Sequence, residues 1–301
     1  MTGRFFLILL LLIGWILLGL FFCRKYLCGL SNSIAAAPAA AAAAPAKDVC
    51  TTKWLLKDGR FSTKEVANNF RFRKSTFTTP NLNNDLSIAV DKIVDHLKKN
   101  DKKSLTITGY YDDDETNRSI LGNLGLARAN TIKRIFTGKG IGSNRVNIAS
   151  ELVEENCFKN DSLMRGGLLA FGTMGDNADR ISDIKTRLFG KPIILHFGTN
   201  QDEISLDAQQ RQDFTDLLYY LDNVPSAKLD VSGHTDNEGD RNYNINLSKE
   251  RADFARDYLQ RNGGLNASRM DVQGFGPDKP VATNSTAEGK AQNRRVEIIL
   301  K

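Results

Sequence analysis

The residues best suited to recognising a charged ligand lie in one stretch near the C-terminus, SGHTDNEGDRNYNINLSKERA, residues 232–252. Asp236 lies in a polar turn, and Arg251 follows in an amphipathic segment with a helical pattern. The simplest interpretation of Asp236 is that its carboxylate caps the turn and the helix. Arg251 would lie near the helix N-terminus, where the helix dipole disfavours a cation. This cost indicates an anionic partner for Arg251, either Asp236 or the carboxylate of a ligand.

The sequence offers little support for catalysis or metal binding. The three histidines, His96, His196 and His234, are far apart, and no nucleophile-elbow pattern accompanies them. The chain has no glycine-rich phosphate-binding motif and no cysteine–histidine cluster with the spacing of a zinc site. We therefore expect a protein that is not an enzyme and that uses neither a metal nor a cofactor.

The charge balance argues against a nucleic-acid partner. The formal net charge is +6, but the 41 Lys and Arg residues are interspersed with 35 Asp and Glu residues. A nucleic-acid surface usually gathers its basic residues on one face or along one helix. We expect no nucleic-acid binding and only a weak attraction to anionic polymers or membrane surfaces.

The N-terminal segment is the most apolar part of the chain. Residues 5–22, FFLILLLLIGWILLGLFF, carry no charge and are close to the length that crosses about 30 Å of hydrocarbon. A cleavable signal peptide is the alternative, although its apolar core is usually shorter. We predict a transmembrane anchor within residues 1–30. The Ala- and Pro-rich residues 31–50 would form a linker that holds the folded body away from the membrane.

Two cysteines, Cys50 and Cys157, lie at the two sides of the first folded region. In an oxidising compartment they could form a disulfide, and two free buried thiols are the alternative. Their spacing alone does not distinguish between these states.

The rest of the chain reads as two copies of one arrangement. In the second copy, residues 191–301, the apolar pattern predicts a strand, a helix, a strand, a helix and two strands. These elements are expected at residues 191–200, 205–225, 227–236, 246–264, 269–276 and 293–300. We predict an α+β fold, in which helices pack on one face of a mixed sheet.

The first copy, residues 51–175, shows the same order of elements, and residues 176–190 read as a helical joint. Its elements are expected at residues 68–75, 84–100, 103–112, 123–140, 145–153 and 166–174. The segment TGYYDDDETN aligns with SGHTDNEGDRN, with one extra residue in the first loop. Asp112 then corresponds to Asp236, and Arg128 corresponds to Arg251.

The motifs of the second copy closely resemble the OmpA-like peptidoglycan-binding domain. The resemblance covers residues 192–300 and rests on GHTD, NINLSKERA, GFGPDKP, NSTAEG and NRRV, in the order typical of the family. It implies a βαβαββ fold and the binding of peptidoglycan through the diaminopimelate of its stem peptide. The side-chain end of diaminopimelate carries an amine and a carboxylate, which Asp236 and Arg251 match in charge. Thr235, Asn244 and Asn200 match pocket positions of the family, and Asn293 and Arg295 match its NRRV stretch.

The first copy resembles the family only weakly. It retains Asp112 and Arg128 as a candidate degenerate site, but Leu121 stands at the position of Asn244. Ser75 stands at the position of Asn200, and the block that ends in NRRV is missing. We expect this copy to act as a spacer or an interaction module, with a second wall-binding site as the alternative.

The resemblance implies a membrane-anchored, non-catalytic protein of the cell envelope that holds peptidoglycan through residues 191–301. Its body would lie in the periplasm of a Gram-negative bacterium, with the anchor in the inner membrane. The alternative is a passive wall tether or adaptor subunit of a larger envelope or secretion complex, with other envelope proteins as partners. A proton-carrying stator is disfavoured because residues 5–22 contain no ionisable side chain.

Overall fold

The structure is a computed structural model that describes residues 53–78, 82–153, 157–196 and 204–301. The predicted anchor at residues 5–22, the linker, Cys50 and Asn200 lie outside the described residues. None of the helices in the described ranges has the length and apolar character needed to cross a bilayer. All described residues belong to one compact unit.

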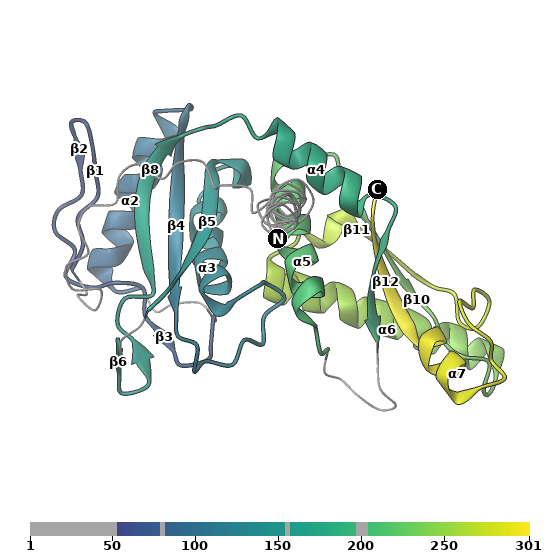
Figure 1. The fold of residues 1–301 in the computed structure, drawn as a ribbon. Helices are drawn as coiled ribbons and strands as arrows, with labels where there is room; N and C mark the ends of the chain where they lie inside the picture. The colour runs from purple at the N-terminus through teal and green to yellow at the C-terminus, as the bar shows by residue number, and fades with distance from the viewer. Residues whose placement is uncertain (1–52, 79–81, 154–156, 197–203) are drawn as a thin grey trace, which may run out of the picture. The chain divides into compact units, whose positions relative to one another are not determined.

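A three-stranded sheet lies at the centre of the first copy. The middle strand β4 (Lys103–Tyr111) is parallel to β5 (Val146–Leu152) and antiparallel to β8 (Gly167–Thr173). Figure 1 shows these three strands side by side. The helices α2 (Asn84–Lys98) and α3 (Leu124–Gly138) supply the apolar residues that pack with β4 in one hydrophobic core.

The second copy has a four-stranded sheet in the order β11-β10-β12-β9. Its strands are β9 (Pro192–His196), β10 (Leu229–Gly233), β11 (Met270–Gly274) and β12 (Arg295–Leu300). β10 is parallel to β11 and antiparallel to β12, and β12 is antiparallel to β9. The sheet is therefore mixed, as the sequence predicts.

Three helices complete the second copy: α5 (Ala208–Asn223), α6 (Arg241–Gly263) and the short α7 (Ala287–Asn293). The predicted order of strand, helix, strand, helix, strand, strand is confirmed, with α7 as an element that the periodicity did not indicate. At the predicted joint, α4 (Ala178–Leu188) forms a helix whose Ile184 and Leu188 belong to the core of the second copy.

Side-chain caps explain where the helices begin. Asn83 and Asn123 accept hydrogen bonds from the first turns of α2 and α3, and Asp207 forms a capping box with Gln210 at α5. The cap of α6 is Asp240, whose carboxylate accepts a hydrogen bond from the backbone N–H of Tyr243. The expectations that Asp236 caps this helix and that Arg251 lies near its N-terminus are therefore wrong, because α6 begins ten residues before Arg251.

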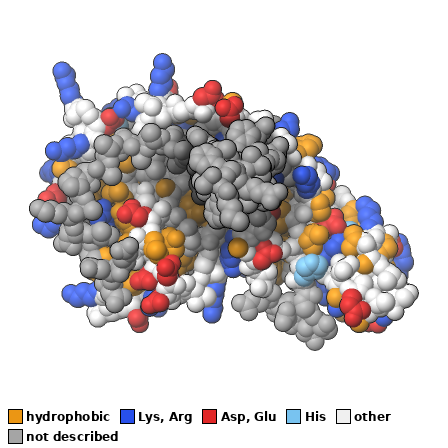
Figure 2. Space-filling model, in the orientation of Figure 1, with side chains coloured by type: hydrophobic (Ala, Val, Ile, Leu, Met, Phe, Trp, Pro, Cys, Tyr) orange, Lys and Arg blue, Asp and Glu red, His pale blue; other side chains and the backbone are white. Residues whose placement is uncertain are grey.

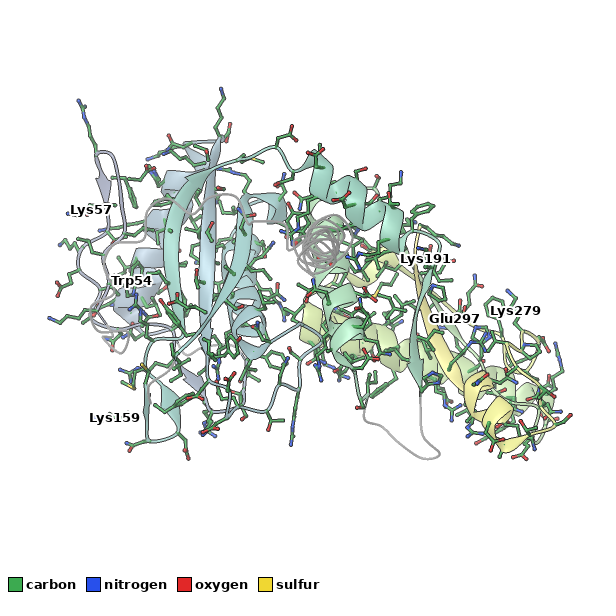
Figure 3. The ribbon with its side chains drawn as sticks, viewed as in Figure 1. Trp54, Lys57, Lys159, Lys191, Lys279 and Glu297 are labelled. Atoms are coloured by element: carbon green, nitrogen blue, oxygen red, sulfur yellow. The ribbon has the colours of Figure 1, made fainter. Side chains whose placement is uncertain are left out.

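The beginning of the first copy differs from the prediction. The expected strand at residues 68–75 forms only β3 (Phe72–Arg73), which pairs with β7 (Ser162–Leu163) in a small separate sheet with β6 (Phe158–Lys159). The alternating Phe70 and Phe72 are buried as predicted, but the left-handed Ser75, with φ of 56°, turns the chain away. A further hairpin, β1 (Lys57–Asp58) and β2 (Phe61–Ser62), was not expected; Lys57 of β1 and the nearby Trp54 are labelled in Figure 3.

One arginine in each copy holds the end of the first helix against the strand that follows. Arg145, in the 3-10 turn η2 (Ser143–Arg145), donates to the carbonyls of Leu97, Asn100 and Lys103. Arg269, in η3 (Ala267–Arg269), donates to the carbonyls of Leu221, Val224 and Ala227. The two sets of acceptors occupy matching places at the end of α2 and α5. This equivalence supports the internal repeat independently of its polar turns.

The two copies also share apolar packing and polar contacts. Ile120 and Leu121 of the first copy lie in the same hydrophobic cluster as Phe214 and Leu259 of the second. Lys133 forms an ion pair with Asp222 at 2.7 Å, and the Asn130 amide donates to the Gly263 carbonyl at 3.0 Å. On the face drawn in Figure 2, basic and acidic side chains are interspersed.

Candidate functional site

The candidate site is built around the turn that follows β10. β10 and β11 are parallel, so the loops after Gly233 and Gly274 leave the same edge of the sheet. Polar side chains are buried here to an extent that is unusual for a loop region. They are His234, Thr235, Asp236, Asn244, Ser248, Asn293 and Arg295, each less than 9% exposed.

Two strand glycines, Gly233 of β10 and Gly274 of β11, pack closely against α6, and this packing fixes the position of the helix against the sheet. A side chain on Gly233 would overlap the carbonyl oxygen of Ser248, and one on Gly274 would lie 2.7 Å from the Ser248 hydroxyl. That hydroxyl accepts a hydrogen bond from the Gly276 N–H at 2.8 Å and donates to the Ile245 carbonyl. Arg251 lies three residues further along α6, so this contact also sets the place of its guanidinium.

Asp236 lies in the turn with one specific cationic partner. Its Oδ2 accepts a hydrogen bond from Arg294 Nη1 at 2.8 Å, and its Oδ1 accepts one from the backbone N–H of Glu238 at 3.2 Å. The turn-capping part of the simple interpretation is therefore confirmed. The cationic partner, Arg294, is the first arginine of the NRRV stretch, which thereby contacts the turn.

Arg251 is half-buried near the same carboxylate, and within the described residues no hydrogen bond or ion pair engages its guanidinium. Burial lowers the pKa of Arg251, and the neighbouring charge of Arg294 lowers it further, whereas Asp236 opposes these effects. The guanidinium remains charged at any physiological pH. A partly desolvated cation whose donors are not used by the protein is well suited to bind an anionic group.

Thr235 and Asn244 fasten the turn from inside. The Thr235 hydroxyl donates to the Asp236 carbonyl, and the Thr235 N–H donates to the Gly276 carbonyl at 3.0 Å. The amide of Asn244 donates to the Glu238 carbonyl at 2.7 Å. The structure therefore brings these two predicted residues to the site, where they hold the backbone that carries Asp236.

Asn293 and Arg295 lie deeper than the pocket that the resemblance implies for them. Asn293 is completely buried, and its amide binds the backbone of Val281 and Ala282 and the side chain of Asn284. Arg295 is 2% exposed and donates to Glu297 and to the carbonyl of Lys279. In this structure both residues shape the loop between β11 and α7, and neither presents an accessible donor.

His234 is a buried polar residue whose situation the sequence did not reveal. Its ring stacks on Phe275 with centroids 5.6 Å apart, and neither ring nitrogen has a hydrogen-bond partner. Its Nε2 lies 3.9 Å from a carboxylate oxygen of Glu297. Figure 3 labels Glu297 on β12 and Lys279 on the preceding loop. Burial and the charge of Arg295 lower the pKa of His234 to about 4, and Glu297 opposes this shift.

The shift predicts a loss of stability in acid. The unfolded chain binds a proton at His234 near pH 6.5, whereas the folded chain resists protonation until about pH 4. The contribution of His234 to the free energy of unfolding is therefore fully present above pH 6.5. About 3 kcal/mol of it is lost as the pH falls toward 4. Replacing His234 by Phe preserves the stacking and removes the titrating ring.

At pH 7.5 we expect His234→Phe to unfold at about the same denaturant concentration as the parent. At pH 4.5 we expect it to unfold at a clearly higher denaturant concentration than the parent. Other acidic groups titrate in both chains, so the measured quantity is the difference between the two chains at each pH. An equal loss of stability for both chains between pH 7.5 and 4.5 would contradict the prediction.

The candidate degenerate site of the first copy is arranged differently from the prediction. Arg128 is completely buried, but its acidic partner is Glu115 at 2.5 Å. The carboxylate of Asp112 instead accepts a hydrogen bond from the backbone N–H of Asp114.

Cys157 is disulfide-bonded. The other three cysteines lie outside the described residues, and its pairing with Cys50 stays a prediction.

Comparison with known proteins gives one family and several partial relatives. The model of the OmpA family matches residues 72–163 and 197–294, together more than half of the chain. The probable lipoprotein YiaD of Escherichia coli is 41% identical over 115 residues, which are 37% of this chain and 52% of YiaD. The peptidoglycan-binding protein ArfA of Mycobacterium tuberculosis is 42% identical over 76 residues, 25% of this chain and 23% of ArfA.

A solved structure, that of the peptidoglycan-associated lipoprotein from Burkholderia pseudomallei, matches at 26% identity with a TM-score of 0.31. The match covers 36% of this chain and 89% of that one. The chain spans about half the length of YiaD and less than a quarter of ArfA.

Proposed function

The chain belongs to the OmpA family, and from this premise we propose that it binds peptidoglycan non-covalently in the cell envelope, without catalysis. The observation that carries the proposal is the guanidinium of Arg251, which is half-buried close to Asp236 and has no hydrogen-bond or ion-pair partner among the residues that the structure describes. One of the relatives, ArfA, is named as a peptidoglycan-binding protein, which supports the proposal.

We further propose that the recognised group is the zwitterionic end of diaminopimelate. Arg251 would bind its carboxylate, since a guanidinium can form two parallel hydrogen bonds with a carboxylate. Asp236 would bind its ammonium. Each oxygen of Asp236 already accepts one hydrogen bond, from Arg294 or from Glu238, and a carboxylate oxygen can accept a second. An uncharged or singly charged ligand would leave one of the two groups unpaired, which gives discrimination.

The remaining parts of the proposal concern location. Residues 5–22 would anchor the chain in a membrane, with the inner membrane of a Gram-negative bacterium favoured, and residues 31–50 would span the gap to the wall. The body would then lie in the periplasm. Partners among other envelope proteins remain a prediction from the sequence.

The test is co-sedimentation of the purified chain with insoluble peptidoglycan. Arg251→Ala is expected to weaken binding about 30-fold or more, because the loss of a desolvated charge contact costs about 2 kcal/mol or more. Arg256→Ala is the matched control, since Arg256 lies on the same helix but pairs with Asp253 and Asp257.

Free diaminopimelate should displace the parent from the wall, and 1,5-diaminopentane, which has the same two amines but no carboxylate, should not. Equal binding by Arg251→Ala and Arg256→Ala would show that the proposed site is not the wall-binding site. Displacement by 1,5-diaminopentane as effective as that by diaminopimelate would remove the zwitterion from the proposal and leave general wall binding intact.

A further inference from the structure

The guanidinium of Arg128 occupies the position in the first copy that Arg251 occupies in the second. Gly109 of β4 packs against Gly125 of α3 as closely as Gly233 of β10 packs against Ser248 of α6. Arg128 and Arg251 each follow this contact by three residues on the helix. The two arginines therefore project from equivalent turns of equivalent helices.

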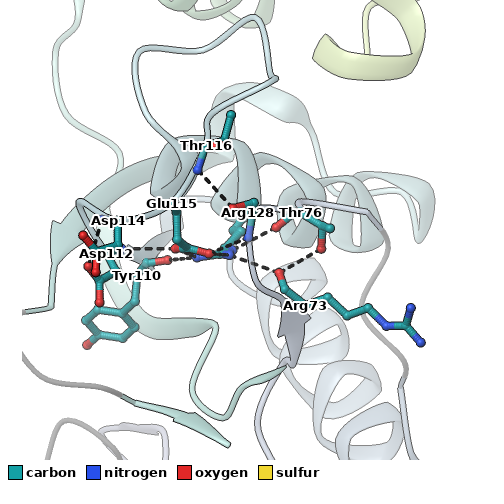
Figure 4. A network of polar contacts seen from close by, with 9 residues as sticks. Arg73, Thr76, Tyr110, Asp112, Asp114, Glu115, Thr116 and Arg128 are labelled. Atoms are coloured by element: carbon teal, nitrogen blue, oxygen red, sulfur yellow. Dashed lines mark hydrogen bonds and ion pairs between the residues drawn. The ribbon is translucent and has the colours of Figure 1, made fainter. Parts of the chain in front are cut away.

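The two guanidinium groups differ in their partners. Arg128 is completely buried, and each of its nitrogens donates hydrogen bonds (Figure 4). Nη1 binds Glu115 Oε2 at 2.7 Å and the Tyr110 carbonyl at 2.8 Å, and Nη2 binds Glu115 Oε1 at 2.5 Å. Nε binds the Thr76 carbonyl at 3.1 Å, and Nη2 also reaches the Arg73 carbonyl at 3.3 Å.

Glu115 is held as a bound carboxylate would be. Its side chain is fully buried, and both of its oxygens face the Arg128 guanidinium in a bidentate pair. Its Oε1 also accepts a hydrogen bond from the Ser75 N–H at 2.8 Å, and its Oε2 accepts one from the Asp112 N–H at 3.1 Å. Four donors thus surround one carboxylate, which satisfies a buried charge.

The corresponding turn of the second copy has no such internal ligand. Glu238 is the glutamate of that turn, and its side chain is 67% exposed and pairs with Lys290 at 2.6 Å. In the part of the chain that the structure describes, the Arg251 guanidinium donates no hydrogen bond, whereas the Arg128 guanidinium uses all of its donors inside the protein.

We propose that the first copy contains a complete carboxylate-binding site that Glu115 fills from within. The ligand class of this site is a small monocarboxylate, and the bound Glu115 closes it to the wall. The same carboxylate ties the left-handed turn at Ser75 to the loop after β4, so it also fixes the path of the backbone at that turn.

Chemical rescue in the full chain tests this site without reference to the wall. Glu115→Ala removes one methylene and the carboxylate, which together correspond to acetate. We expect the variant to melt at least about 5 °C below the parent in sodium chloride. Sodium acetate at equal ionic strength should recover most of this loss, and it should leave the parent unchanged.

Two variants control for other effects of acetate. Asp114→Ala removes an exposed acid from the same turn and should melt like the parent in both salts. Glu115→Gln keeps the shape but not the charge, and it should lose stability that acetate does not restore because the site is full. The proposal would be overturned if Glu115→Gln were as stable as the parent, or if acetate had the same effect on all chains. If Glu115→Ala does not fold, the stability of Glu115→Gln provides the test.

A second experiment rests on the proposed function. With Arg251 replaced by Ala, the intact first copy should add no measurable sedimentation with peptidoglycan above the blank. Residual binding that disappears when Arg128 is also replaced would show that the first copy is open. The outcome of the acetate experiment does not depend on wall binding, so the two proposals can fail separately.

Discussion

Replacing Gly233 by Ala is expected to destabilise the chain by about 3 kcal/mol or more and to abolish its binding to peptidoglycan. The added methyl group would overlap the carbonyl oxygen of Ser248, and the group in the way is helix backbone, not a movable side chain. To relieve the overlap, α6 must move away from β10. Because β10 leads into Asp236 and α6 carries Arg251, this movement changes the distance between the two charges. Thermal unfolding and wall sedimentation measure the two effects.

Gly138→Ala is the matched control for this substitution. Gly138 is the last residue of α3, and a side chain there would meet no atom within 4 Å. The control should keep the melting temperature or raise it slightly, since Ala favours the helix over Gly. A Gly233→Ala chain that melts and binds like the Gly138→Ala chain would show that the close packing of β10 on α6 is not required.

Replacing Arg128 by Ala is expected to lower the free energy of unfolding by about 3–5 kcal/mol, because it leaves a buried carboxylate without its cation. The substitution also removes the donors that satisfy the carbonyls of Arg73, Thr76 and Tyr110. Urea unfolding provides the measurement, and Arg118→Ala is the control because Arg118 is exposed on the loop that also carries Glu115. If the two arginine variants unfold at the same urea concentration, the buried pair does not stabilise the first copy.

The double variant Glu115→Ala with Arg128→Ala completes the comparison. If the main cost is that of an uncompensated buried charge, removing both partners should cost less than the sum of the two single changes. Additive losses would indicate that each side chain acts through separate contacts.

Much of the fold could be predicted because its signals are local. The apolar periodicity of α2, α5 and β12 is contained within each segment, and the observed elements lie inside the predicted ranges. The alignment of Arg128 with Arg251 also held in space, since the same glycine contact precedes each arginine, but the acid that pairs with Arg128 is Glu115 and not the predicted Asp112. The helix α7 was missed because seven residues are too few to show a helical period.

The internal carboxylate could not be predicted in this way. Glu115 ends the run DDDE, and an acidic run is ordinarily a solvated turn. Its burial depends on the path of a segment forty residues earlier, which reverses at Ser75. Arg145 and Arg269 are an intermediate case. Neither has a signal alone, but each is the first residue of a predicted strand in its own copy, so a comparison of the two copies could have indicated a shared role.

The internal Glu115 ligand has a consequence for the valency of wall attachment. On the proposed function, a chain with two open sites would be bivalent, and its second site would rebind at an effective concentration in the millimolar range for a short connection. Such a chain would leave the wall only when both sites were empty at the same moment. With Arg128 already occupied by Glu115, attachment on this proposal would be monovalent, and one dissociation event at Asp236 and Arg251 would set the residence time of the whole chain.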